Sequence, residues 1–162
     1  MRRFRFLAVF FALLFLFEIS LLFDPIDRQV IRPFSSLVAA ASGRLLRLGG
    51  QQVNISGTVI AGTCLAIDIH NGCNGVEAMM FVVAAVIAFP TSWPQRLVAA
   101  LAGAIILQVA NLIRVVTLYL VGCYHRAWFE TFHLGIWQSL MFGVAVAFFV
   151  LWSRRTKLVH AP

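Results

Sequence analysis

The sequence predicts an all-α polytopic membrane protein with four transmembrane helices, and with an outer-face interfacial helix and a small β-hairpin between the first two spans. Three observations predict this class: 61% of the 162 residues are hydrophobic, breakers separate long apolar segments, and basic residues cluster beside those segments. A chain of this length forms a single domain over 1–162. The net charge of +7 predicts a lipid bilayer and no nucleic acid as the partner, because basic patches of this kind are typical of membrane loops.

The spans follow from apolar length. A bilayer core of about 30 Å requires roughly 20 apolar residues per spanning helix. Four segments are candidates: 4–23, 76–89, 97–124 and 134–152. Glu18 interrupts the first segment and no small-residue cleavage site follows it, so we expect an uncleaved anchor helix and not a signal peptide. Pro90 and Pro94 stop the second segment.

The basic residues predict the orientation. They flank the spans at Arg2, Arg3, Arg5, Arg96, Arg154, Arg155 and Lys157. Cytoplasmic loops carry an excess of Lys and Arg, so we expect both termini in the cytoplasm and both 24–72 and 123–133 on the outer face.

The outer-face segment 24–72 is predicted in two parts. Residues 30–48 carry three arginines among apolar residues, a composition too charged to span and suited to a helix in the membrane interface. Residues 53–69 are rich in β-branched residues with glycines between them, which predicts a small β-hairpin. The remaining 73–152 is then a core of three helices.

Polar residues of the three core helices fall at similar depths. At about 1.5 Å per residue from the cytoplasmic end of each helix, Cys73, Arg114 and His133 lie at roughly 24, 26 and 28 Å. A second layer lies at roughly 18 to 21 Å and holds Glu77, Asn111 and Gln138. We therefore expect these side chains to meet near the outer boundary.

An arginine inside an apolar helix costs at least about 2.5–3.5 kcal/mol on insertion scales, and it usually faces the bundle interior with a partner. Glu77 is the nearest candidate counter-charge for Arg114. An ion pair that only fixes helix packing is the alternative for these two residues. Asn111 and Gln138 equally suit interhelical hydrogen bonds without any catalytic role.

The outer layer has the composition of a nucleophilic site. Cys73 precedes an apolar helix, and a helix N-terminus or a neighbouring cation favours the reactive thiolate. Asn71 or Asn74 suits the helix cap. His133 would act as general base and acid, and Arg114 would hold an oxyanion or a substrate carbonyl. The predicted chemistry is acyl transfer from a peptide bond.

Three motifs carry a resemblance to a known family. They are "NGCNGVEA" around Cys73, "NLIRV" at 111–115 and "FHLGIWQSL" at 132–140. In this order and spacing they resemble the exosortase/archaeosortase family over the chain from about residue 58 to the end of the fourth span. The short length and the form of the cysteine motif are most similar to the exosortase H branch. The chain departs from the longer exosortases, which have about twice as many helices.

The resemblance implies a bacterial cysteine transpeptidase or protease, multi-pass in the inner membrane, with its active site at the periplasmic face. Its partners would be exported proteins with a C-terminal sorting signal, made of a short motif, a transmembrane helix and a basic tail. A thioester would form and an acceptor amine or water would resolve it. Carried over by motif, Cys73 is the nucleophile, Arg114 the transition-state arginine and His133 the catalytic histidine. Glu77, Asn111, Asn74 and Gln138 are expected to support them, and no cofactor or metal is expected.

Other interpretations stay open at this point. Outside the cytoplasm Cys73 is able to form a structural disulfide with Cys64 or Cys123. A redox role or a metal site is the second alternative, although no Cys-x-x-Cys pair is present and the spacings of Cys64, His70, Cys73 and His133 match no closed zinc pattern. A non-enzymatic membrane scaffold is the third.

Overall fold

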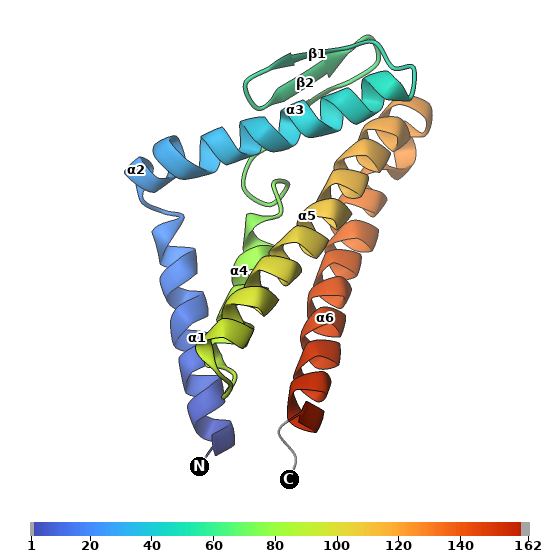
Figure 1. Ribbon diagram of the computed structural model, residues 1–162. Helices are drawn as coiled ribbons and strands as arrows, with labels where there is room; N and C mark the ends of the chain where they lie inside the picture. Colours follow the sequence, from blue (N-terminus) through green and yellow to red (C-terminus); the bar gives the residue numbers. More distant parts are fainter. Residues whose placement is uncertain (1, 160–162) are drawn as a thin grey trace.

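The computed structural model describes residues 2–159 of the chain, with side chains from 4 to 156, as a mostly helical protein with a small sheet at one end (Figure 1). Four helices run between the two ends: α1 (Arg2–Ser20), α4 (Val76–Ala88), α5 (Trp93–Tyr124) and α6 (Trp137–Val159). α1 begins and α6 ends at the same end of the molecule (Figure 1). The side chains of Arg2, Arg3 and Lys157, which contribute to the predicted orientation, lie outside the described part.

The helices differ in their capacity to span a bilayer. Within the described residues, 93–124 and 126–156 are each long and apolar enough to cross a membrane. α1 and the following helical segment Asp24–Leu48 pass the same test only as a pair, which is bent by 77°. α4 is a shorter apolar helix of 13 residues. The structure therefore provides two or three candidate spans, and the predicted count of four is not reproduced.

Proline and turn chemistry explain these boundaries. α1 ends at Ser20 because a turn over 21–23 leads into Asp24-Pro25, where Pro25 opens a new helix. α4 ends at Ala88 because Phe89 precedes Pro90 and takes an extended conformation. α5 starts earlier than predicted because Pro94 occupies its first turn, where no backbone N–H is required.

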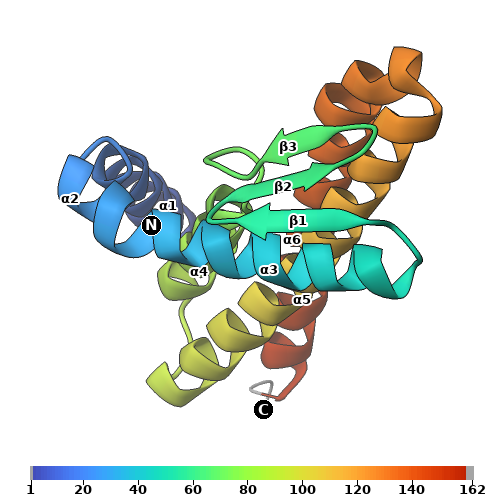
Figure 2. The same ribbon diagram turned by 90° about the horizontal axis from the view of Figure 1, so that it is seen from above.

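The segment predicted to lie in the interface is helical. α2 (Asp24–Ile26), a π-helical turn (Asp27–Ile31) and α3 (Arg32–Leu48) follow one another. α3 crosses over the ends of the other helices, and the sheet lies against it (Figure 1, Figure 2). Its location in a membrane interface stays a prediction.

The sheet has one strand more than the predicted hairpin. β1 (Val53–Ser56), β2 (Val59–Gly62) and β3 (Ala66–Asp68) are antiparallel in the order β1-β2-β3. A two-residue turn at Gly57-Thr58 joins β1 to β2, and Gly57 has a φ of 58°. β3 was not predicted because three residues are too few to show an alternating apolar pattern. The strand is stabilised by its hydrogen-bonded pairing with β2.

Two hydrophobic cores position the site. The outer core joins the sheet to α3 and α5 through Ile60, Ile69, Leu46 and Tyr119, all at most 1% exposed. The inner core lies between α4, α5 and α6, where Gly103 allows α5 to approach Val82 closely. The loop between β3 and α4 connects these two cores, and it carries Cys73.

Candidate active site

The Cys73 loop is a tight turn at the start of α4. The backbone N–H groups of Cys73 and Asn74 both donate to the carbonyl of His70, at 2.9 and 3.1 Å. Gly72 and Gly75 have φ values of 87° and 81°, which lie in the left-handed region that favours glycine. These two glycines, one before and one after Cys73 in the chain, thus allow the backbone to make a tight turn at the cysteine.

Asn74 holds this loop in place. Its Oδ1 accepts a hydrogen bond at 3.0 Å from the backbone N–H of Val76, the first residue of α4. Its Nδ2 donates to the Ser35 hydroxyl of α3 at 3.1 Å and to Asn71 Oδ1 at 3.2 Å. Asn74 and Ser35 are almost fully buried. The N-cap residue of α4 is Gly75 and not an asparagine, so the predicted asparagine cap is wrong. Asn74 instead bonds the first N–H of the helix and ties the loop to α3, a contact that the sequence did not indicate.

His133 meets Cys73 although 60 residues separate the two. It lies in a π-helical stretch (Thr131–Ile136) that leads into α6, and its Nε2 is 3.2 Å from the Cys73 Sγ. The ring of Phe129 packs beside the imidazole, with centroids 5.7 Å apart. Cysteine and histidine thus have the contact that a nucleophile and its base require.

Arg114 and Asn111 lie on the face of α5 that is directed at the loop. Arg114 is 4% exposed and Asn111 is fully buried. An ideal Cβ on Gly75 would come within 3.0 Å of the Asn111 side chain and of the Gln108 amide. Within the described part of the chain, the Arg114 Nε and both amide groups have no hydrogen-bond partner. Gln108 lies on the same face of α5 because it is three residues before Asn111. It was not among the predicted site residues, although this helical spacing is visible in the sequence.

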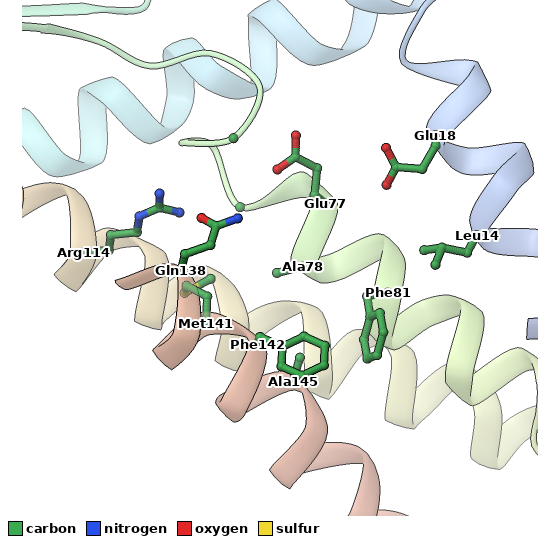
Figure 3. Close-up of a pocket in the computed structure, with 12 residues that line it drawn as sticks. Leu14, Glu18, Glu77, Ala78, Phe81, Arg114, Gln138, Met141, Phe142 and Ala145 are labelled. Atoms are coloured by element: carbon green, nitrogen blue, oxygen red, sulfur yellow. The ribbon is translucent and has the colours of Figure 1, made fainter. Parts of the chain in front are cut away.

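A cavity of about 220 Å³ opens beside the loop and extends between α1, α4 and α6 (Figure 3). Its polar lining consists of Glu18, Glu77, Arg114, Gln138 and the glycines 72 and 75. Its apolar lining consists of Leu14, Ala78, Phe81, Met141, Phe142 and Ala145. In the sequence Glu18 only interrupts the predicted anchor helix, whereas the structure places it in the same cavity as Glu77 and Arg114.

The electrostatics of Cys73 differ from the expected stabilised thiolate. Burial raises the pKa of the Cys73 thiol, the Arg114 charge lowers it in part, and the charges of Glu77 and Asp68 raise it further. The first turn of α4 begins three residues after Cys73, and its Val76 N–H is already bonded to Asn74. The resting group is therefore the thiol, and the base must remove its proton during attack.

Glu77 is not an ion-pair partner of Arg114. Among the described residues, the ion pairs are Arg28 with Asp24 and Arg32 with Asp27, all on the outer segment. Glu77 and Arg114 line the same cavity from different helices (Figure 3). Glu77 is therefore not the counter-charge of Arg114, and the alternative of an ion pair that fixes helix packing is not found between these two described residues.

The other cysteines form a disulfide with each other. Cys64 of the β2–β3 loop is bonded to Cys123 near the end of α5, and Cys73 is free. A structural disulfide through Cys73 is therefore excluded, and Cys64 is not available as a metal ligand. No three His, Cys, Asp or Glu side chains gather closely enough to hold a metal ion in the part of the chain that the structure describes.

The arrangement provides the groups that acyl transfer requires. Cys73 supplies a nucleophile, His133 a proton acceptor in contact with it, and Arg114 a positive charge that interacts with the sulfur. Asn111 packs against the loop, and Gln138 and Glu77 line the adjoining cavity.

The comparison with protein families gives one match. The family model described as "Transmembrane exosortase (Exosortase_EpsH)" matches residues 3–159. No curated protein and no solved structure matches the chain.

Proposed function

Because the chain belongs to the transmembrane exosortase family, we propose that it is a membrane-embedded cysteine peptidase or transpeptidase that processes exported proteins. Its substrates would carry a C-terminal sorting signal, consisting of a short motif, one transmembrane helix and a basic tail. The observation that carries the proposal is the 3.2 Å contact between the Cys73 Sγ and the His133 Nε2. It joins a free cysteine to a histidine from a distant segment.

The first half of the proposed reaction forms a thioester. Neutral His133 takes the proton of the Cys73 thiol as the sulfur attacks the scissile carbonyl. Arg114 stabilises the oxyanion that develops on the carbonyl oxygen, because a buried guanidinium retains a strong electrostatic effect there. His133 then gives its proton to the departing amine of the tail.

The second half resolves the thioester. An amine of an acceptor molecule, or water, attacks the carbonyl carbon, and the Cys73 sulfur leaves as a thiolate that recovers a proton. Aminolysis joins the exported protein to the acceptor, and hydrolysis releases it.

The reaction would take place at the periplasmic face of the bacterial inner membrane. The loop before α4 and the π-helical stretch before α6, which carry Cys73 and His133, lie away from the end where α1 begins and α6 ends (Figure 1). The Cys64–Cys123 disulfide also lies away from that end and supports an oxidising compartment. The predicted cytoplasmic location of both termini agrees with this orientation.

A cleavage assay tests the proposal. The enzyme is co-produced with a secreted reporter that ends in a motif, a transmembrane helix and a basic tail, and the mass of the reporter shows whether the tail is removed. Cys73→Ala should abolish removal, and Arg114→Ala should slow it by about 10²–10³-fold, as loss of an oxyanion donor does.

Arg44→Ala, which removes an exposed arginine of α3, is the matched control and should cleave normally. Tail removal that persists in Cys73→Ala would refute the proposed nucleophile. Equal rates for Arg114→Ala and Arg44→Ala would remove Arg114 from the site.

A further inference from the structure

The cavity beside Cys73 contains two carboxylates from different helices. Glu18 of α1 and Glu77 of α4 both line it and are close enough to interact electrostatically (Figure 3). The described part of the chain provides neither of them with an ion-pair partner within 4.0 Å. The cavity therefore contains two carboxyl groups and the single guanidinium of Arg114.

An independent feature indicates that the cavity receives a polar ligand. Arg114 is 4% exposed, and its Nε has no hydrogen-bond partner among the described residues. Its side chain extends toward the cavity, where it lies near Gln138 (Figure 3). A buried N–H group without a hydrogen bond is costly, so a carbonyl or carboxylate oxygen of a ligand would satisfy the Arg114 Nε.

The cavity also lies next to the nucleophile. Gly72 and Gly75 contribute to its wall, and Cys73 lies between them in the chain. Its deeper walls are apolar, with Leu14, Phe81 and Phe142 facing the space (Figure 3). Apolar walls lower the local dielectric and strengthen the attraction between the carboxylates and a cation.

We propose that Glu18 and Glu77 bind a primary ammonium group in this cavity and thereby supply the acyl acceptor to the thioester on Cys73. The inference rests on the proposed function, because it assigns the second substrate of that reaction. It also gives α1, which was predicted only as an anchor, a direct role in binding.

The chemical step is balanced within the site. A carboxylate of the pair takes one proton from the bound ammonium, which becomes a neutral amine. The amine nitrogen forms a bond to the thioester carbon, the bond from carbon to the Cys73 sulfur breaks, and the sulfur leaves with the electron pair. The new amide nitrogen gives its extra proton to His133, and His133 passes it to the thiolate. Water competes for the same thioester, so occupancy by the ammonium decides between transfer and hydrolysis.

A test of ammonium binding requires no sorting substrate. Cys73 of the purified protein is modified in detergent with aminoethyl methanethiosulfonate, a primary ammonium, or with sulfonatoethyl methanethiosulfonate, an anion of similar size. Both reagents react with the thiolate, so the ratio of the two rates cancels any change in its population. Cys64 and Cys123 do not compete because they form a disulfide.

We expect the cation-to-anion rate ratio to fall about tenfold or more in Glu18→Gln and in Glu77→Gln, because focused charge in a cleft changes local ion concentration by such factors. Asp24→Asn removes an exposed carboxylate on α2 and should leave the ratio unchanged. Glu18 lies on α1, whereas Glu77 lies on α4 directly after the Cys73 loop. Glu18→Gln therefore tests the proposal even if Glu77→Gln disturbs that loop. A ratio that stays constant in Glu18→Gln would overturn the proposal.

A competition arm identifies the carrier of the ammonium group. Here Cys73 is modified with the neutral reagent methyl methanethiosulfonate, and its rate of modification is measured in the presence of a competing ammonium compound. The competitors are ethylammonium chloride, Nα-acetyl-lysine amide and lysophosphatidylethanolamine. Sodium chloride at equal ionic strength is the control. Slower modification by any of the three supports the proposal, and the strongest protectant distinguishes a protein amine from a lipid amine. Protection by none would overturn it. Tail removal in the reporter assay is measured separately, so a failure here leaves the evidence on Cys73 catalysis intact.

Discussion

The two sulfur sites near the sheet end of the molecule differ in how they join distant segments. Cys64 and Cys123 are joined covalently across 59 positions and lock the β2–β3 loop to the end of α5. Cys73 and His133 are 60 positions apart and share only a 3.2 Å contact. Tyr119, almost fully buried, places its hydroxyl 3.6 Å from Cys64 and continues the locked region into the outer core. The disulfide therefore holds its two segments together covalently, whereas the contact between Cys73 and His133 allows a proton to pass between sulfur and imidazole.

Removing the base should give the largest difference between these sites. His133→Ala should lower the rate of thioester formation by about 10²–10⁴-fold, because proton transfer by a positioned base contributes that much. The thermal unfolding temperature should stay close to that of the parent protein. The control is His125→Ala, which removes an exposed histidine after α5. If both variants form the thioester equally fast, His133 is not the base.

Removing the covalent link should affect stability and not reactivity. The Cys64→Ser, Cys123→Ser variant releases a loop closed over 59 positions and should lose about 4 kcal/mol of unfolding free energy. Denaturant titration in detergent measures the loss, and the alkylation rate of Cys73 should change little under native conditions. An unchanged midpoint, or a large loss of Cys73 reactivity, would show that the two sites are not separate in this way.

The pH dependence of Cys73 sharpens the contrast with an activated thiolate. Burial and the charges of Glu77 and Asp68 hold the pKa of the thiol above its ordinary value, with Arg114 opposing them. The thiolate fraction therefore grows with rising pH, and alkylation by iodoacetamide should increase about a hundredfold between about pH 7 and pH 9 without reaching a plateau. Mass spectrometry of the alkylated peptide measures the rate. A plateau already reached below about pH 8 would contradict the buried-thiol description.

The smallest expected effect concerns the support of the loop. Asn74→Ala removes the hydrogen bonds to the first N–H of α4 and to Ser35, and should reduce stability by about 1–3 kcal/mol, because buried polar groups are left without a partner. Catalysis should fall as well, since the loop also carries Cys73. Asn54→Ala, at an exposed position of β1, serves as the control in the same unfolding measurement and should change neither property.

Patterns that depend on one helix or one short motif were predictable from the sequence. The apolar runs and prolines predicted α4 and α5 to within a few residues, because these signals are local. Counting depth along separate helices brought Cys73 and His133 to one level, and the structure places them in contact. That count succeeded because helix rise is constant and the helices begin near a common boundary.

Features that depend on packing between segments were not predictable. Glu18 lines the cavity because α1 packs beside α4, and no spacing rule connects residue 18 to residue 77. Ser35 supports Asn74 across 39 positions through the angle of α3. The thiol pKa depends on how deeply the loop is buried, which a helix-terminus argument does not include. These are consequences of tertiary structure and leave no periodic signal.

Under the proposed function, the shortness of α4 would limit which peptide bonds can reach Cys73. With 13 residues it is about 20 Å long, whereas α5 with 32 residues is about 48 Å long. In the proposed orientation, with the C-terminal end of α4 at the cytoplasmic boundary of a hydrocarbon layer of about 30 Å, Cys73 would lie below the level of the outer headgroups, or the lipid would thin around it. A loop of a folded domain stays above that level. The few unstructured residues that enter a transmembrane segment would be drawn down to it, so the length of one helix would exclude most surface peptide bonds before any side chain is recognised.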